Sequence, residues 1–250
     1  MKIGAHAVLF RERIASETAD ILTGMAKAGF EVAEMGARFF SLDKKGQLLE
    51  ALEQSGIELA GLHVAAPFPE LAVDKDAVME RVLNAAQFLQ DMPNRNIIFS
   101  SMQPEGVDIA AAARNLEEIA QRCLEMMGVK INYHNHAHEF ENNMAIFSIL
   151  LETAPNLLFG MDLGWVYKGG CNPIEVFSKY SERIPYVHLR DANETDFTEL
   201  GEGNFDYPKL MAVLQNAWGN EGWAVVEYEH GEADMQRYAK AREFLKGLGY

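Results

Sequence analysis

The sequence predicts an α/β fold of the closed (β/α)8 barrel type, the TIM barrel, formed as a single domain over residues 1–250. Two observations predict this fold. Short apolar runs alternate with longer helical segments eight times along the chain, and strands that alternate with helices pair in parallel. Eight such units in 250 residues also match the size of this barrel. A doubly wound open sheet is the alternative, and the absence of a glycine-rich phosphate loop after the first run disfavours it.

The expected elements follow one another without a linker. The eight strands are expected at Lys2–Ala7, Phe30–Met35, Ile57–Val64, Asn96–Ser100, Val129–His134, Leu157–Asp162, Ile184–Leu189 and Gly222–Tyr228. The helices between and after them are expected at Ser16–Lys27, Asp43–Gln54, Val73–Gln90, Val107–Met127, Met144–Thr153, Pro173–Lys179, Tyr207–Asn216 and Ala233–Leu245.

Particular residues mark the ends of these helices. Ser16 is expected to cap the first helix, and Pro173 stands near the start of the sixth, where its missing N–H costs no hydrogen bond. Gly29, Gly56 and Gly128 each stand between a helix and the following strand. Glycine suits the left-handed position just after a helix, so these residues predict three helix ends.

Composition excludes several classes of function. The formal net charge of −15 argues against a nucleic acid or an anionic membrane as partner. The two cysteines, Cys123 and Cys171, match no zinc-site spacing and indicate reduced thiols. The chain starts with an expected strand and not with a signal peptide, and no run is long enough to cross a bilayer. We therefore expect a cytoplasmic protein that acts on a small molecule.

The segment from Asn132 to Phe140 carries the strongest functional signal. In the fifth strand Val129, Ile131 and Tyr133 point to one face, whereas Asn132, His134 and His136 point to the other. Imidazoles gathered at the end of a buried strand need polar partners, which indicates a metal or a polar substrate. The alternative is a loop whose histidines face solvent.

Other predicted strands also end in residues that bind metals or move protons. These residues are Glu34, His63, Asp162, His188 and Glu227. Because active sites of this barrel lie where strands end and the following loops begin, we expect these side chains to meet at one mouth. Imidazole nitrogen together with carboxylate oxygen suits Mn²⁺, Co²⁺, Zn²⁺ or Fe²⁺ better than Ca²⁺. The alternative for Asp162 and Glu227 is a buried salt bridge to Arg190 or Lys168.

These motifs resemble the sugar phosphate isomerase/epimerase family, which has the xylose isomerase-like barrel. Tagatose 3-epimerase, hydroxypyruvate isomerase, inosose isomerase and inosose dehydratase belong to that family. The resemblance covers the whole chain and is carried by Gly29–Glu34, Tyr133–His136, Gly160–Asp162, Val187–Asp191, Gly201–Gly203 and Val226–Glu227.

The resemblance implies one divalent ion, with Mn²⁺ favoured and Zn²⁺, Co²⁺, Fe²⁺ or Mg²⁺ as alternatives. Its expected ligands are His134, Asp162, His188 and Glu227. The epimerases of the family carry Glu at the position of His134, His at the position of Trp165 and Arg at the position of Glu194. These departures favour the dehydratase and keto-sugar branches over epimerases of the tagatose type.

The expected activity is proton abstraction next to a carbonyl of a keto-sugar, an inosose or a small hydroxy-ketone, leading to isomerisation, epimerisation or loss of water. The expected catalytic residues are Glu227, His134 and His136, and the expected substrate-binding residues are Glu34, His63, Trp165 and Arg190. The aromatic loops Phe39–Phe40 and Pro67–Pro69 are expected to cover the site or to form a contact in a homo-oligomer. A non-catalytic sugar-binding barrel and an endonuclease-type metal hydrolase are the alternative functions.

Overall fold

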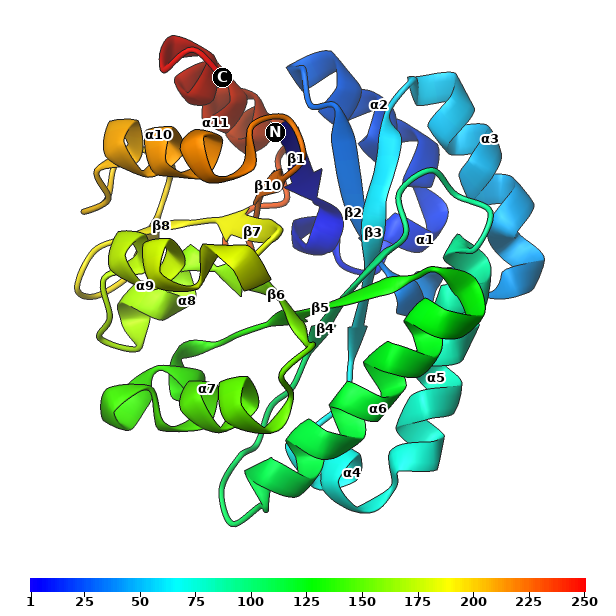
Figure 1. The fold of residues 1–250 in the computed structure, drawn as a ribbon. Helices are drawn as coiled ribbons and strands as arrows, with labels where there is room; N and C mark the ends of the chain where they lie inside the picture. The colour runs from blue at the N-terminus through cyan, green and yellow to red at the C-terminus, as the bar shows by residue number, and fades with distance from the viewer.

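The computed structural model describes all 250 residues and contains a closed barrel of parallel strands surrounded by helices (Figure 1). The strands follow the ring order β1, β10, β7, β6, β5, β4, β3, β2, and every neighbouring pair is parallel. They span Lys2–His6 (β1), Val32–Gly36 (β2), Glu58–Ala65 (β3), Asn96–Ser100 (β4), Lys130–His134 (β5), Leu158–Asp162 (β6), Tyr186–Leu189 (β7) and Trp223–Val226 (β10). The predicted fold class is therefore confirmed.

One main helix follows each barrel strand and packs outside the ring (Figure 1). These helices span Thr18–Ala28 (α2), Lys45–Ser55 (α3), Lys75–Leu89 (α5), Ile109–Met127 (α6), Glu141–Thr153 (α7), Pro173–Tyr180 (α9), Tyr207–Trp218 (α10) and Met235–Gly247 (α11). The three expected glycine caps are confirmed, since Gly29, Gly56 and Gly128 have left-handed φ values of 99°, 70° and 65°. None of the helices combines the length and apolar character needed to span a bilayer.

Several short elements lie in the loops after the strands. The short helices span Arg13–Ser16 (α1), Phe68–Val73 (α4) and Leu163–Lys168 (α8), and an antiparallel pair joins Asp191–Ala192 (β8) to Phe197–Thr198 (β9). Single turns of 3₁₀ helix span Ala7–Phe10 (η1), Ala37–Phe39 (η2), Leu42–Lys44 (η3), Ala137–Glu139 (η4) and Ser181–Arg183 (η5). All but the last follow barrel strands directly or lie in the loops after them, so they shape the mouth where the strands end.

Two local expectations are wrong. Ser16 is the last residue of α1 and does not cap the next helix, whose flanking residue is Glu17. The segment Pro67–Pro69 does not cover the site, because Phe68 starts α4 and is fully buried, with its ring centroid 6.5 Å from that of Tyr133. Aromatic residues next to proline resemble an exposed loop in the sequence, but here they form a helix start packed into the core.

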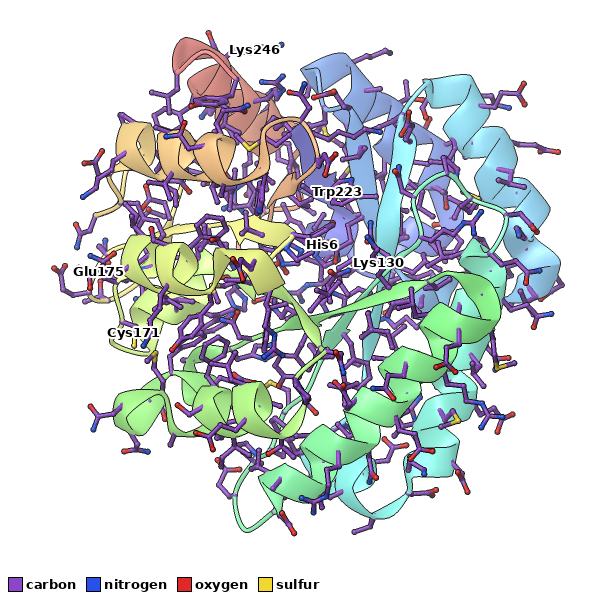
Figure 2. All side chains as sticks on the ribbon, in the orientation of Figure 1. His6, Lys130, Cys171, Glu175, Trp223 and Lys246 are labelled. Atoms are coloured by element: carbon purple, nitrogen blue, oxygen red, sulfur yellow. The ribbon has the colours of Figure 1, made fainter.

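The barrel interior is mostly apolar at one end, apart from the buried amides of Asn96 and Asn132, and carries ionisable side chains at the other end. A small cluster of Val32, Ala60, Ile98, Tyr186 and Val225 fills the interior, separate from the large core between strands and helices. Beyond this cluster, towards the strand ends, the inward side chains become polar. Figure 2 shows His6 near the centre of the ring, with Glu175 and Lys246 at the periphery. The polar end of the interior is therefore where chemistry is expected.

An irregularity in β3 decides which way His63 points. The register with β2 shifts between Ala33 and Glu34, which leaves one extra residue on β3. As a result Leu59 and Leu62 both face the outer core, although strict alternation would place them on opposite faces. Gly61 lies at the shift, where a Cβ atom would come within 2.5 Å of the Asn96 carbonyl oxygen. The extra residue thus turns His63 towards the barrel interior.

We expect Phe147→Ala to destabilise the protein by about 3–5 kcal/mol, because it leaves a cavity in the core. Phe147 is fully buried, with its ring centroid 4.8 Å from that of Phe140 and 5.0 Å from that of Phe159. Urea denaturation measures this loss. Leu124→Ala is the control, since this side chain is 52% exposed and its loss should change stability by no more than about 0.5 kcal/mol. A similar stability for both variants would contradict this account of the core.

Candidate active site

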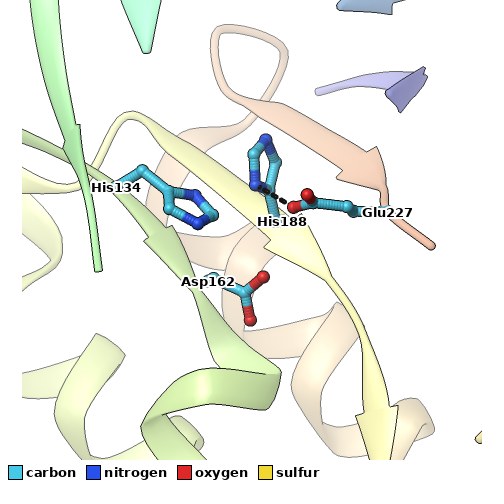
Figure 3. Close-up of side chains that lie close together, drawn as sticks. All are labelled: His134, Asp162, His188 and Glu227. Atoms are coloured by element: carbon cyan, nitrogen blue, oxygen red, sulfur yellow. Dashed lines mark ion pairs between the residues drawn. The ribbon is translucent and has the colours of Figure 1, made fainter. Parts of the chain in front are cut away.

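Four side chains from adjacent strands converge at the polar end of the barrel (Figure 3). They are His134, Asp162, His188 and Glu227. One ligand atom from each lies within 4.8 Å of those of the others, and none of the four residues is more than 2% exposed. The predicted convergence of these groups is confirmed. They come from the ends of β5, β6, β7 and β10, which are neighbours in the ring.

Strand register explains why these residues meet. Asp162 pairs with His188 across β6 and β7, and His188 pairs with Val225 across β7 and β10. Because side chains alternate along a strand, Val225 and Glu227 both face inwards, so Glu227 follows one step beyond the level of His188. The parallel sheet therefore places the four groups at nearly the same depth of the barrel.

Several buried atoms of this cluster are not satisfied by a hydrogen bond within the protein. The buried atoms His134 Nδ1, His188 Nδ1 and Glu227 Oε2 make no hydrogen bond. His188 Nδ1 and Glu227 Oε2 lie 2.6 Å apart as an ion pair, which the dashed line in Figure 3 marks, whereas His134 Nδ1 has no protein partner. A buried polar atom without a partner, such as His134 Nδ1, is unfavourable, and a bound cation would satisfy it together with the other two atoms. Two imidazoles and two carboxylates also form a donor set suited to a divalent transition ion. The residues present therefore fit a metal site.

Glu34 forms a second layer behind the cluster. Its Oε2 accepts hydrogen bonds from His188 Nε2 at 2.6 Å and from the Tyr186 hydroxyl at 2.7 Å. Its Oε1 accepts from His63 Nδ1 at 3.0 Å. Glu34 is fully buried and does not line the cavity described below. Both of its oxygens thus orient protein groups, and a carboxylate that fixes a histidine in this way is a common partner of metal-binding imidazoles.

His6 joins this second layer, although the sequence analysis did not select it. Its Nε2 lies 3.6 Å from Glu34 Oε1 and its Nδ1 lies 3.2 Å from Glu227 Oε1. His6 is the last residue of β1, so its position at a strand end is the signal that marks the other site residues. The first strand was expected to end one residue later, at Ala7, so His6 was not recognised as a residue at a strand end.

The buried charges balance one another. Burial acts to lower the pKa of His188, but the negative charges of Glu34 and Glu227 outweigh this effect and raise that pKa well above its usual range. Burial acts to raise the pKa of both carboxyl groups, and the positive charge of His188 outweighs it and holds each pKa well below its usual range. His188 is therefore an imidazolium between two carboxylates in the metal-free protein.

Asp162 and His134 respond mainly to burial. Burial raises the pKa of Asp162 to about 7, although nearby Arg190 acts in the opposite direction. Burial likewise lowers the pKa of His134 well below its usual range, so its ring is neutral at pH 7. Neutral imidazole is the form that binds a metal ion.

His136 lies beside the cluster in the loop after β5. Its ring centroid is 5.2 Å from that of His134 and 5.7 Å from that of Trp165. Glu139 holds this loop, accepting hydrogen bonds from the His136 backbone N–H at 2.8 Å and from the Tyr133 hydroxyl at 2.5 Å. Burial lowers the pKa of the His136 imidazole. Glu139 was not selected from the sequence, because its role depends on the turn that brings it back to His136.

Arg190 and Trp165 lie behind the cluster. Arg190 is 3% exposed, and its guanidinium donates to Glu229 at 2.8 Å and to Asp162 at 3.5 Å. The same guanidinium lies 5.3 Å from the Trp165 ring. Neither Arg190 nor Trp165 lines the large cavity. The salt bridge from Asp162 to Arg190 that the sequence offered as an alternative is therefore formed, with a long distance of 3.5 Å. Lys168 makes no such bridge and donates to the Asn193 carbonyl oxygen at 2.9 Å.

A cavity of about 680 Å³ opens onto the cluster. Its inner end is lined by His6, His63, Ser100, His134, His136 and Glu227. His63 Nε2 lies 3.0 Å from the Ser100 hydroxyl, which fixes the ring at the cavity wall. The expected loop Phe39–Phe40 also lines this cavity, further out. A small polar molecule at the inner end would contact both the cluster and His136.

Comparison with known proteins decides the family. The family model described as the xylose isomerase-like TIM barrel matches residues 23–248. The chain belongs to this family. Among curated relatives, an inosose dehydratase of Geobacillus kaustophilus (strain HTA426) is 29% identical over 89% of this chain and 83% of its own length.

Solved structures agree with the fold. The probable 3-DHS dehydratase AsbF of Bacillus anthracis superposes with a TM-score of 0.79 at 15% identity, covering 98% of this chain and 99% of its own. A D-tagatose 3-epimerase-like protein gives a TM-score of 0.75 at 21% identity, covering 99% and 97%. The resemblance inferred from the motifs is confirmed, and so is the expectation of an enzyme of the isomerase, epimerase or lyase kind.

We expect Glu34→Gln to lower the pKa of His188 in the metal-free protein, because it removes one of the two carboxylates that stabilise the imidazolium. A pH titration of the ¹⁵N signals of the histidine rings measures this change. Tyr186→Phe is the control, since it removes a hydrogen bond to Glu34 but keeps the carboxylate charge, and the titration should stay close to that of the unmodified protein. If the His188 titration were unchanged in Glu34→Gln, Glu34 would not be its main partner.

Proposed function

We propose that this protein is a divalent-metal-dependent enzyme that removes a proton next to the carbonyl of an inosose or a related keto-polyol and then expels a hydroxyl group as water. The observation that carries this proposal is the convergence of His134, Asp162, His188 and Glu227 at the end of a cavity that His136 also lines. The similarity to an inosose dehydratase supports the same class of substrate.

His134, Asp162, His188 and Glu227 are the residues that would hold the ion, with Mn²⁺ favoured among the divalent metals. When bound, such an ion supplies Lewis-acid stabilisation of the negative charge that develops on the substrate carbonyl oxygen. Glu34 keeps the His188 ring in place through its hydrogen bond to Nε2, so that Nδ1 faces the other ligands. His188 would have to lose its imidazolium proton to serve as a ligand, since only neutral imidazole can bind a metal ion.

Glu227 and His136 are the groups proposed to move protons. Glu227 lines the cavity and is ionised at neutral pH, so its carboxylate accepts the proton from the substrate carbon. His136 lines the same cavity, and its imidazolium donates a proton to the departing hydroxyl. The lowered pKa of His136 makes that imidazolium a stronger acid, at the expense of its population at neutral pH. The carbon proton thus passes to Glu227, and the hydroxyl leaves as water with the proton from His136. A double bond forms between the carbon that lost the proton and the carbon that lost the hydroxyl.

The remaining site residues are proposed to position either the substrate or the side chains that act on it. Glu34 and Ser100 engage both ring nitrogens of His63, so its ring is proposed to form a fixed wall of the inner cavity against which the substrate lies. Arg190 and Trp165 act from behind Asp162 and His136, and support those groups through a buried ion pair and a ring contact. His134 is proposed as a ligand and not as the main acid, because its ring belongs to the cluster itself.

The function is tested by incubating the Mn²⁺-loaded protein with inososes and keto-sugars in deuterated water. We expect loss of water from an inosose, with deuterium appearing at the carbon next to the carbonyl in recovered substrate, because proton removal there is reversible. Mass spectrometry and NMR follow both events. Product formation without deuterium exchange and without a primary isotope effect at that carbon would refute proton abstraction. A mechanism with a hydride shift would then have to be considered.

Metal binding and proton transfer can be separated by two substitutions. Asp162→Ala should abolish both metal content and turnover, because it removes a charged ligand from the cluster. His136→Ala should keep the metal but lower turnover by about 10²–10⁴-fold, the usual contribution of a general acid or base. Metal analysis and steady-state kinetics measure the two effects, with the exposed Glu53→Ala as the control. Full turnover of Asp162→Ala, or loss of metal from His136→Ala, would contradict these assignments.

A further inference from the structure

The cavity has two ends of different character. Volumes of about 300–1,000 Å³ enclose ligands of drug size, and this cavity measures about 680 Å³, so a free inosose ring would fill only a part of it. The inner end carries the polar groups of the site. The outer end is built by the first three strand–helix units and is lined by Val8, Phe39, Phe40, Leu42, Val64 and Ala85. The cavity thus continues from the proposed chemical site into an apolar chamber.

Two side chains leave apolar surface uncovered in this chamber. Leu42 is 41% exposed and is one of few large apolar side chains on the surface of the molecule. Phe39 is partly exposed, and the Arg38 guanidinium lies 4.6 Å from its ring centroid. Phe40 is almost fully buried and packs towards Phe88, which anchors the loop. Apolar surface that faces a concave site continuous with a catalytic cluster is typical of ligand contact.

The charges at the outer end favour a neutral group over an anionic one as the occupant. Arg38 pairs with Glu12 at 3.1 Å. Arg81 pairs with Glu70 at 2.6 Å and also donates to the Ala65 carbonyl oxygen at 3.1 Å. A phosphate or carboxylate would need a guanidinium or ammonium free to bind it. Both arginines of the cavity wall already have a carboxylate partner, which favours a neutral occupant of the chamber.

We infer that the substrate is a keto-polyol ring that carries a neutral apolar substituent, with the ring at the polar inner end and the substituent in the outer chamber. An aromatic substituent fits best, because Phe39 offers a ring face or edge for aromatic contact. The inference rests on the proposed function for the position of the ring. It adds that the physiological substrate is an ether or glycoside of a keto-polyol and not the free inosose.

The test compares the binding of phenyl and methyl D-glucopyranosides, which present a polyol ring but carry no ketone and do not react. Isothermal titration calorimetry on the Mn²⁺-loaded protein gives both dissociation constants. We expect the phenyl glycoside to bind about tenfold more tightly, a modest value for burial of one aromatic ring. Phe39→Ala and Leu42→Ser should each remove most of this preference and leave the affinity for the methyl glycoside unchanged.

Leu49→Ser is the matched control, because Leu49 is also 41% exposed but lies on α3 and does not line the cavity. It should keep the full preference for the phenyl glycoside. Equal affinity for both glycosides, failure of both to bind, or a preference that survives both Phe39→Ala and Leu42→Ser would overturn the inference. Turnover of inososes without a phenyl preference would contradict the outer subsite but support the proposed function. A phenyl preference without turnover of any ketone would support the outer subsite and contradict the proposed function.

Discussion

The site depends on the need of buried carboxylates for positive partners. Glu34, Asp162 and Glu227 are each at most 2% exposed, and an isolated carboxylate in such surroundings is strongly unfavourable. His188 reduces this cost for two of them at once, with one ring nitrogen 2.6 Å from Glu34 and the other 2.6 Å from Glu227. A cation in the cluster would take over the charge that the imidazolium provides in its absence. The same electrostatic requirement therefore sets the arrangement of the polar barrel interior and is compatible with a bound cation.

Much of the fold could be predicted because its signals are local. Alternating apolar runs gave the eight barrel strands, and Gly29, Gly56 and Gly128 marked helix ends that only a left-handed residue can form. The short helices α1, α4 and α8 and the β8–β9 pair could not be predicted, because their few residues are held by tertiary contacts and carry no periodic pattern. The burial of Phe68 is an example, since nothing in Pro67–Pro69 distinguishes a loop from a helix start.

The candidate site was predictable where strand ends meet and not where the chain departs from regular geometry. Asp162, His188 and Glu227 follow uninterrupted apolar strands, so alternation and parallel register were sufficient to bring them together. The inward turn of His63 depends instead on a one-residue irregularity near Gly61 that has no sequence pattern of its own. The position of Glu34 behind His188 likewise depends on two strands, β2 and β7, that are not neighbours in the ring, and only the closed barrel reveals that contact.

The proposed function and the proposed outer subsite would separate chemistry from recognition within one barrel. The cluster lies on β5, β6, β7 and β10, whereas the outer chamber is built by the loops that follow β1 and β2, together with α5. The loop residues Phe39 and Leu42 make no contact with the buried charge network, so they can change without leaving a carboxylate unpaired. The reverse does not hold, because replacing any member of the network leaves a buried charge without its partner. Under these proposals, substrate range should vary through the loops after β1 and β2 and through α5, while the inner cluster stays under a strict electrostatic constraint.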